Sequence, residues 1–157
     1  MRQITHAKLL SLAHYDPETG VFTRLADGYV MGKPDRKGYL LTWLKSWRFR
    51  SHRLAWFYMT GNWPAQEIDH INGDTSDNRW ANLRECTHQQ NNHNQPKRRN
   101  NKSGVKGVSL DRSGKWHVQV CLNCQVHHGG SFECLKDAEV AVQRLRARLH
   151  GEFANHG

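Results

Sequence analysis

An apolar stripe near the C-terminal end constrains the fold more than any other part of the sequence. Between residues 135 and 150, apolar side chains recur at the spacing of one helix face, and Gly151 follows where a helix commonly ends. Such a stripe is stable only when it is buried against a second apolar surface. Its members are Ala138, Ala141, Val142, Leu145 and Leu149.

Three segments before this helix are expected to be the strands that supply that surface. They span residues 105–110, 115–122 and 125–132 and are separated by the turn residues Ser113-Gly114 and Asn123-Cys124. Side chains of the middle segment alternate between an apolar face (Trp116, Val118, Val120, Leu122) and a polar face (Lys115, His117, Gln119, Cys121). This alternation predicts a small β3α module, in which one sheet face packs on the helix.

The first 50 residues are expected to form short strands and turns. Residues 21–25 and 38–44 are rich in apolar and aromatic side chains, as strands are. A helix is predicted to follow, with Ser51 as its N-cap, residues 52–59 as its body and Gly61 at its end. Its four large apolar side chains make it the expected core helix of this region.

Composition favours a polyanionic partner and argues against a membrane span. The 157 residues include 23 Lys and Arg against 14 Asp and Glu, which gives a net charge of +9 and a pI near 9.7. The mean hydropathy is −0.83, and no stretch approaches the length of about 18 apolar residues that a membrane span needs. The first ten residues lack the apolar core of a signal peptide, so a cytoplasmic protein is expected. The positive charge makes nucleic acid the expected partner.

The charge is unevenly distributed along the chain. Residues 67–96 carry five acidic and two basic side chains, whereas the segments on both sides are strongly basic. Acidic groups beside a phosphate backbone repel it unless a cation lies between them, so a metal site is one interpretation and chance clustering in a loop is the other. The four cysteines favour free thiols over a zinc site, because only one Cys-x-x-Cys pair is present, at Cys121 and Cys124.

A sequence motif occupies this acidic middle. It contains Asp69-His70, a loop with Gly73, then Asp77-Asn78-Arg79, Asn82-Leu83-Arg84 and an Asn-bearing segment that includes Asn91. In this order and spacing the segment resembles the HNH (ββα-metal) endonucleases, in particular the phage and intron-encoded homing type. The likeness runs without a gap over about 27 residues.

The resemblance implies a role for each motif residue. Asp69 and Asn91 are the expected metal ligands, and their oxygen atoms suit one Mg²⁺ ion, with Mn²⁺ as the alternative. His70 is the expected general base, and Asn82 is expected to hold the loop and orient His70. Asp69 and His70 are neighbours at a strand end, so their side chains are expected to point to opposite sides.

The C-terminal module resembles the AP2/ERF DNA-binding domain. The likeness rests on Ser103-Gly104-Val105-Lys106-Gly107, Gly114-Lys115-Trp116 and Gly129-Gly130-Ser131-Phe132, and it covers residues 103–154. In that family the sheet lies in the major groove of DNA. The alternative interpretation of the polar face in this chain is an ordinary solvated strand face. The residues expected to contact DNA, including linker residues that run along phosphates, are Lys97, Arg98, Arg99, Lys106, Ser109, Arg112, Lys115, His117, Gln119 and His128. The helix arginines, Arg146 among them, are expected to be solvated.

Together these features predict an α+β protein of two domains. Residues 1–98 form an HNH nuclease domain, with N-terminal strands and a helix before the motif core at 67–95, and residues 99–157 form the β3α AP2-like domain. The expected function is metal-dependent, site-selective cleavage of double-stranded DNA in a bacterial or phage-infected cell, by a monomer or a DNA-assembled dimer. A non-cleaving DNA-binding regulator is the main alternative, and RNA binding is a weaker one.

Overall fold

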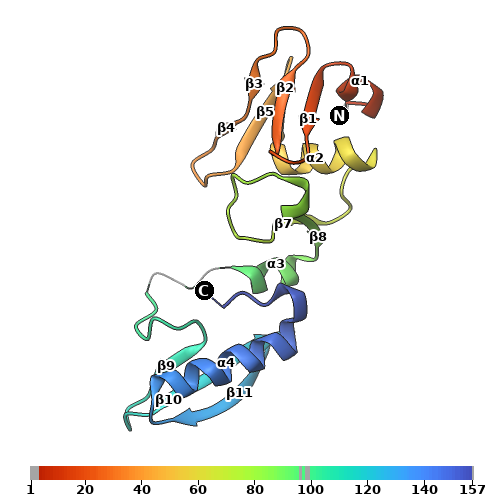
Figure 1. The fold of residues 1–157 in the computed structure, drawn as a ribbon. Coiled ribbons are helices and arrows are strands. Elements are labelled where there is room, and N and C mark those ends of the chain that lie inside the picture. Colours follow the sequence, from red (N-terminus) through yellow and green to blue (C-terminus); the bar gives the residue numbers. More distant parts are fainter. Residues whose placement is uncertain (1–3, 96, 98–99, 157) are drawn as a thin grey trace. The chain divides into compact units, whose positions relative to one another are not determined.

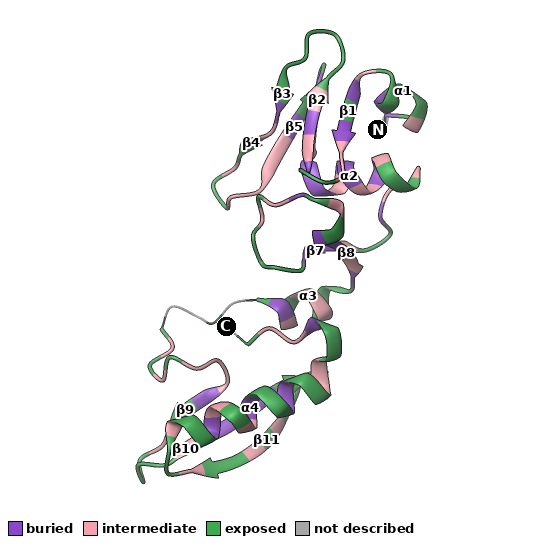
Figure 2. Cartoon of the chain, in the orientation of Figure 1, coloured by how far each residue is buried: buried purple, intermediate pink, exposed green. Residues whose placement is uncertain are grey.

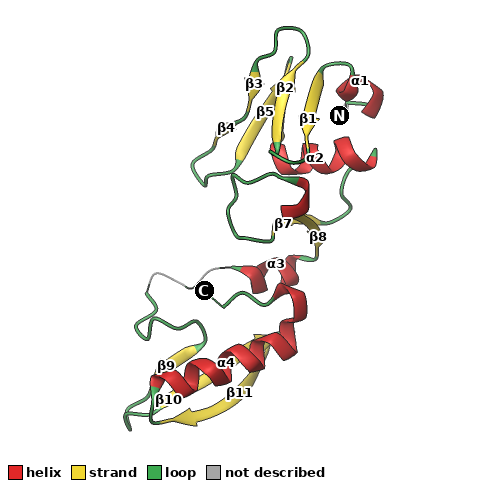
Figure 3. Cartoon of the chain, in the orientation of Figure 1, coloured by secondary structure: helices red, strands yellow, loops and turns green. Residues whose placement is uncertain are grey.

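The computed structural model describes residues 4–95, 97 and 100–156. The chain divides into two compact units, Met1–Thr87 and His88–Gly157, and each is described by itself. Figures 1 and 3 show the elements. In chain order they are α1 (His6–Leu10), β1 (Ala13–Asp16), β2 (Val21–Arg24), β3 (Val30–Met31), β4 (Lys33–Pro34), β5 (Leu40–Leu44), β6 (Trp47–Arg50), α2 (Ser51–Thr60), β7 (Glu67–His70), η1 (Trp80–Asn82), β8 (Leu83–Cys86), α3 (His88–Asn94), β9 (Val108–Leu110), β10 (Trp116–Leu122), β11 (Gln125–Phe132), α4 (Leu135–His150) and η2 (Gly151–Phe153).

Two three-stranded antiparallel sheets and helix α2 build the core of the first unit. The strand orders are β1-β2-β3 and β4-β5-β6. Apolar side chains from the strands and from α2 form one buried cluster, which includes Tyr15, Phe22, Leu44 and Leu54. In Figure 2 the buried residues of this unit gather on the strands and on α2. The expected strands and core helix are therefore present.

Two local expectations for the first 50 residues were wrong. The first 50 residues also contain a helix, α1, which begins after Thr5 because the Thr5 hydroxyl accepts a hydrogen bond from the Lys8 amide at 3.2 Å. The strand predicted from residue 38 begins at Leu40. Its first residues belong to a turn in which the Asp35 carboxylate accepts from the Tyr39 amide at 3.1 Å.

Helix α2 starts one residue earlier than expected. Arg50, not Ser51, is the N-cap, and it makes no side-chain capping bond. The Ser51 hydroxyl instead bonds the Thr42 hydroxyl of β5 at 2.8 Å, inside the core. The predicted end is confirmed: Gly61 has a φ of 74°, and its amide donates to the Phe57 carbonyl.

The second unit contains the predicted three-stranded sheet and helix. Strands run in the order β11-β10-β9, all antiparallel, and α4 packs on one sheet face. Val118 and Val120 are buried together with Ala138 and Val142 of α4, whereas the polar residues that alternate with them on β10 are exposed. The β3α arrangement is confirmed, and kinship with AP2/ERF domains stays a prediction.

Strand β9 is shorter than the predicted strand. It pairs only with Trp116–Val118 of β10, because the chain before Val108 turns away from the sheet. Gly107 makes this turn with a φ of 78°, and a Cβ atom there would lie 2.7 Å from the Gln119 carbonyl oxygen. The Gln119 amide still donates to the Gly107 carbonyl at 2.9 Å, and beyond that point the edge of β10 has no β9 partner.

The expectation that the helix arginines are solvated fails for Arg146. This side chain is 2% exposed and lies one helical turn after Val142, on the inner face of α4. Its Nη2 atom donates to the Lys106 carbonyl at 2.5 Å, and its Nη1 atom lies 3.2 Å from His156 Nδ1. A Cβ atom on Gly107 would lie 3.1 Å from Arg146 Nη2, so the glycine before β9 leaves room for the guanidinium.

The four cysteines are free thiols, of which Cys86 is buried and Cys121, Cys124 and Cys134 are exposed. Burial raises the pKa of the Cys86 thiol to about 11, with a smaller contribution from Asp69.

No helix within the described residues is long and apolar enough to cross a membrane. The division of the chain after Thr87 places α3 in the second unit. The sequence predicts one domain over residues 1–98, and that boundary stays a prediction.

Candidate functional site

Strands β7 and β8 hold the motif residues at adjacent positions. The two strands are antiparallel, with Asp69 opposite Arg84 and His70 opposite Leu83. Because successive side chains on a strand point to opposite faces, Asp69 and His70 have different neighbours. Their alternation matches the expectation for a strand end.

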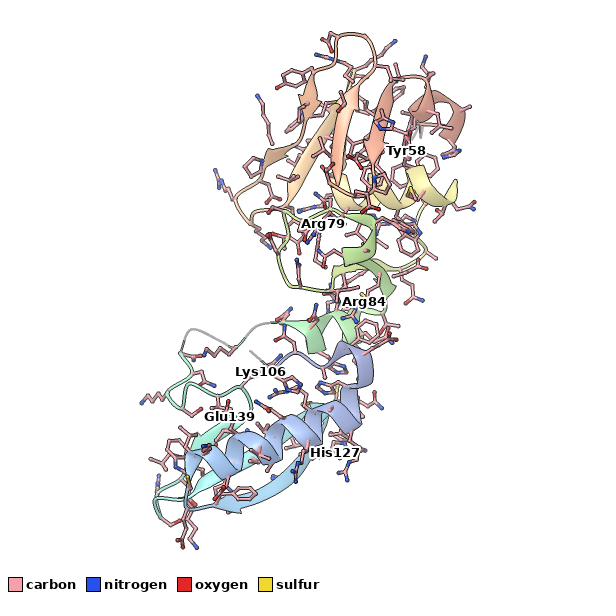
Figure 4. The ribbon with its side chains drawn as sticks, viewed as in Figure 1. Tyr58, Arg79, Arg84, Lys106, His127 and Glu139 are labelled. Carbon is pink, nitrogen blue, oxygen red and sulfur yellow. The ribbon has the colours of Figure 1, made fainter. Side chains whose placement is uncertain are left out.

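Asp69 forms an ion pair with Arg84. The Arg84 Nε and Nη2 atoms both donate to Asp69 Oδ2, at 2.9 and 2.8 Å. The side chains are 5% (Asp69) and 14% (Arg84) exposed, so water screens their charges little. Figure 4 labels Arg84 in this part of the structure. The charge of Asp69 is thus balanced by the protein, and a metal ion at this carboxylate would have to share it with Arg84.

His70 is buried in the first unit, where Asn78 is its hydrogen-bond partner. Its Nε2 atom is 3.2 Å from Asn78 Oδ1, and the other amide atom of Asn78, Nδ2, donates to the Ser76 carbonyl. This bonding fixes the amide orientation, so Nε2 carries the proton and the lone pair belongs to Nδ1. His70 therefore has the tautomer that a base acting through Nδ1 needs.

Burial keeps the His70 imidazole neutral. Only 4% of the residue is exposed, and its ring lies 5.0 Å from the His52 ring and 6.0 Å from the Tyr39 ring. Burial lowers the pKa of His70, while the Asn78 hydrogen bond and then the Asp69 charge oppose the shift. A neutral ring can accept a proton at neutral pH, provided that water reaches it.

Asn82 connects the two ends of the loop between β7 and η1. Its Oδ1 accepts from the Asn72 amide at 3.0 Å. Its Nδ2 donates to the Asp77 carbonyl at 2.8 Å and to Asn72 Oδ1 at 3.0 Å. The Asn82 amide thus occupies all of its principal donor and acceptor positions within this loop, and its role in orienting His70 stays a prediction.

A second set of contacts ties the loop to the core. The buried Tyr15 hydroxyl of β1 donates to the Asn78 carbonyl at 2.7 Å. Gly20 lies so close that a Cβ atom there would be 2.4 Å from the Asn78 carbonyl carbon. Within the loop, Asp77 forms an ion pair with Arg79 at 2.6 Å. This hydrogen bond lowers the pKa of Asp77 to about 2. Arg79 is labelled in Figure 4. The sequence motif gives no sign of this contact of Tyr15, which spans 63 positions.

The proposed second metal ligand lies in the other unit. Asn91 belongs to α3 and is partly exposed. A shared metal ion at Asp69 and Asn91 therefore stays a prediction. Among the described residues, no group of three or more His, Cys, Asp or Glu side chains could hold a metal ion.

Most of the residues expected to contact DNA lie at the surface of the second unit. The exposed ones are Lys97, Ser109, Arg112, Lys115, His117, Gln119 and His128. His117 is held within this surface: its Nε2 is 2.8 Å from Asp111 Oδ2 and its Nδ1 is 2.9 Å from the Ser131 hydroxyl. Arg98 and Arg99 lie outside the described residues.

Lys106 differs from the other expected contacts because its ammonium group points inward. It donates to the backbone carbonyls of His93, Gln95 and Asn155, at 3.0 Å for His93 and 3.3 Å for Asn155. Burial, and then the charge of Arg146, lower the pKa of Lys106 to about 8. The β-strand pattern gave no signal for this placement, since Lys106 lies in the turn before β9. Figure 4 labels Lys106.

Comparison with known proteins identifies the class of this region. Residues 50–93 match the sequence model of a family described as HNH endonuclease, so the chain carries an HNH-type domain. A solved structure described as the HNH homing endonuclease I-HmuI, in a study of DNA binding and cleavage, is 23% identical, with a TM-score of 0.49. That match covers 60% of this chain and 57% of I-HmuI.

A curated relative shows the family to which the chain belongs. Protein 3.8 of Escherichia phage T7 is 31% identical over 107 residues, which are 67% of this chain and 88% of that protein. The chain therefore belongs to the same family as phage T7 protein 3.8. The HNH match includes α2, β7, β8 and most of α3, and so contains Asp69, His70, Asn82 and Asn91.

Proposed function

We propose that this protein is a metal-dependent DNA endonuclease of the HNH homing type. The observation that carries the proposal is a neutral, oriented His70 imidazole next to Asp69 in sequence, inside the region that matches the HNH endonuclease family. A neutral imidazole is the side chain best suited to remove a proton from water near pH 7. The substrate in this proposal is the phosphodiester backbone of double-stranded DNA.

Each motif residue has a defined role in the proposed reaction. His70 accepts the proton of the attacking water through Nδ1, while Asn78 holds Nε2 and thereby the ring orientation. Asn82 keeps the loop closed around this pair through its bonds to Asn72 and Asp77. Asp69 and Asn91 would hold one divalent ion, Mg²⁺ or Mn²⁺, through carboxylate and amide oxygens. When bound, such an ion stabilises the negative charge that develops on the phosphate.

Arg84 has two roles in this scheme. It balances the charge of Asp69, and its guanidinium is a group that binds phosphate oxygens. The protein acts on DNA in the cytoplasm of a bacterial or phage-infected cell, as a monomer that nicks one strand or as a dimer assembled on DNA. The second unit places the cut through its exposed basic sheet face, with the AP2-like module as the reader.

A plasmid assay tests the proposal. Supercoiled DNA is incubated with the wild-type protein in Mg²⁺, in Mn²⁺ and in EDTA, and with the variants His70→Ala and His14→Ala. We expect nicking only with a divalent ion, a loss of about 10²–10⁴-fold in His70→Ala, and no loss in His14→Ala, an exposed histidine of β1. Binding of DNA without cleavage under every ion would favour the regulator instead, and cleavage of RNA alone would refute the DNA substrate.

A further inference from the structure

The second unit contains a basic cavity beside the open edge of β10. Its volume is about 880 Å³. The lining comes from α3, from the segment before β9, from β10 and its turn, and from α4. The cavity begins at the hydrogen bond between the Gln119 amide and the Gly107 carbonyl, where β10 last contacts the segment before β9. From there it continues along Val120 and Cys121.

The charges that line this cavity are all positive. Its ionisable basic residues are His88, His93, Lys97, Lys106, Arg146 and His150, and none of the described residues that line it is acidic. Cations buried in proteins are normally paired with carboxylates, because an unpaired buried charge is costly. No carboxylate within the described lining balances this positive charge.

Lys106 and Arg146 carry this argument. Three backbone carbonyls accept hydrogen bonds from Lys106, and the Lys106 carbonyl accepts from Arg146, but carbonyl groups have no net charge to balance either cation. Burial lowers the pKa of Arg146, and the charge of Arg146 helps to lower that of Lys106. Two cations that repel each other in a partly enclosed site favour the binding of an anion.

A stacked pair of histidines supplies a further unsatisfied group. The rings of His93 and His150 are nearly parallel, at 4°, with centroids 3.8 Å apart. His150 Nε2 lies 3.0 Å from the Cys121 carbonyl, so Nε2 is the donor. Its Nδ1 atom is buried and has no hydrogen-bond partner among the described residues. An anion bound nearby would favour the protonated form of the ring, in which Nδ1 is also a donor.

We infer that this cavity binds a phosphate group of the DNA backbone, in addition to the phosphates that the exposed sheet face contacts; Gln119 of that face also lines the cavity. Its volume accommodates a phosphodiester with its sugar. The amides of Gln89, Asn92 and Asn123 in the lining are of the kind that donate to phosphate oxygens. The inference rests on the proposed DNA substrate, and it assigns α3 and α4 a direct role in holding that substrate.

Asn92→Asp is the variant that tests this inference. Asn92 is exposed on α3 and lines the cavity, and its Oδ1 accepts from Gln95 Nε2 at 3.0 Å. Aspartate retains this acceptor and the shape of the side chain but adds one negative charge to the lining. Asn62→Asp is the matched control, because Asn62 is an exposed residue of the first unit and the substitution changes the net charge equally. Arg146 is not replaced, since its burial makes misfolding a competing explanation.

Affinity for a labelled DNA duplex is measured in EDTA over a range of salt concentrations. We expect Asn92→Asp to weaken binding by about tenfold at low salt and to reduce the salt slope by about 0.9, the value for one phosphate contact. Asn62→Asp should stay within about twofold of the wild type. Inorganic pyrophosphate should raise the Tm of the wild type and of Asn62→Asp but not that of Asn92→Asp.

The outcomes distinguish this inference from the proposed function. Equal behaviour of the two Asp variants overturns the cavity inference, even if the plasmid is cut. A specific loss in Asn92→Asp with no cleavage under any ion supports the cavity and refutes the nuclease. Tighter binding of single-stranded RNA than of duplex DNA, with the same loss in Asn92→Asp, overturns the assignment to DNA.

Discussion

The two units treat buried polar groups in opposite ways. In the first unit Arg84 balances the charge of Asp69, and Asn78 fixes the tautomer of His70. The protein itself therefore satisfies both groups. In the second unit Lys106 and Arg146 have no carboxylate beside them within the described lining of the cavity. A site for chemistry needs groups whose orientation is fixed before the substrate arrives, whereas a binding site gains affinity when the ligand supplies the missing charge.

The largest expected effect comes from breaking the buried ion pair. Arg84→Met removes the guanidinium that pairs with the buried Asp69 carboxylate, so the free energy of unfolding should fall by about 3–5 kcal/mol. Urea unfolding in EDTA measures this loss. Arg79→Met is the control, because the Arg79–Asp77 pair lies at the surface, and it should cost much less.

The same variant also tests whether Asp69 binds a metal ion. If it does, Mg²⁺ or Mn²⁺ should raise the Tm of Arg84→Met more than that of the wild type, since no guanidinium competes for the carboxylate. An equal rise in both proteins would contradict Asp69 as a ligand.

The next effect concerns the pH dependence of the first unit. Burial, and then the charge of His70, lower the pKa of His52 to about 3, so His52 is neutral when folded. The unfolded chain takes up this proton near pH 6.5, so the stability is complete above pH 6.5 and falls by about 1.4 kcal/mol per pH unit below it, until the folded pKa is reached.

His52→Gln should make that decline shallower. Urea unfolding at pH 7, 6 and 5 gives the slope, and His14→Gln, at an exposed position, should retain the decline of the wild type. A slope that His52→Gln leaves unchanged would mean that this histidine is solvated in the folded protein.

A smaller effect is expected from the link between the core and the loop. Tyr15→Phe removes the donor to the Asn78 carbonyl and leaves that carbonyl buried, which should cost about 1–3 kcal/mol. If the link also holds Asn78 against His70, cleavage should fall by more than the loss of folded protein explains. Tyr29→Phe, on an exposed ring, is the control for both measurements.

The smallest effect on stability is expected on the exposed sheet face. Lys115 lies 3.8 Å from Glu133, and both side chains are largely exposed. Lys115→Ala should leave the Tm unchanged but reduce the salt slope of DNA binding by about one, as expected for a phosphate contact. Combined with Asn92→Asp, the two reductions should add if the sheet face and the cavity bind different phosphates.

Repeating patterns in the sequence predicted the second unit better than the first. The bounds of β11 and α4 were predicted to the residue, and those of β10 within one, because period-two and helical spacing extend over many positions. The strands β3 and β4 have two residues each, too few for any periodicity, and α1 has only five. The cavity was not predictable, because it follows from the early end of β9 at Gly107.

The candidate site was predictable in its motif but not in its partners. Asp69, His70 and Asn82 were identified by their order and spacing, and all three lie on or beside β7 and β8. The residues that set their chemistry were not identified in those roles. His52 and Tyr15 lie 18 and 55 positions from His70, and nothing local marks such contacts before the chain is folded.

The hydrogen bond from Tyr15 to Asn78 has a consequence for any effort to transplant the motif. A peptide or chimera that carries only residues 67–95 would lack the β1 tyrosine, and the close approach of Gly20, that confine the loop backbone at Asn78. The smallest fragment expected to cleave DNA therefore includes the amino-terminal sheet. Truncation from the N-terminus should abolish cleavage before it reaches the motif.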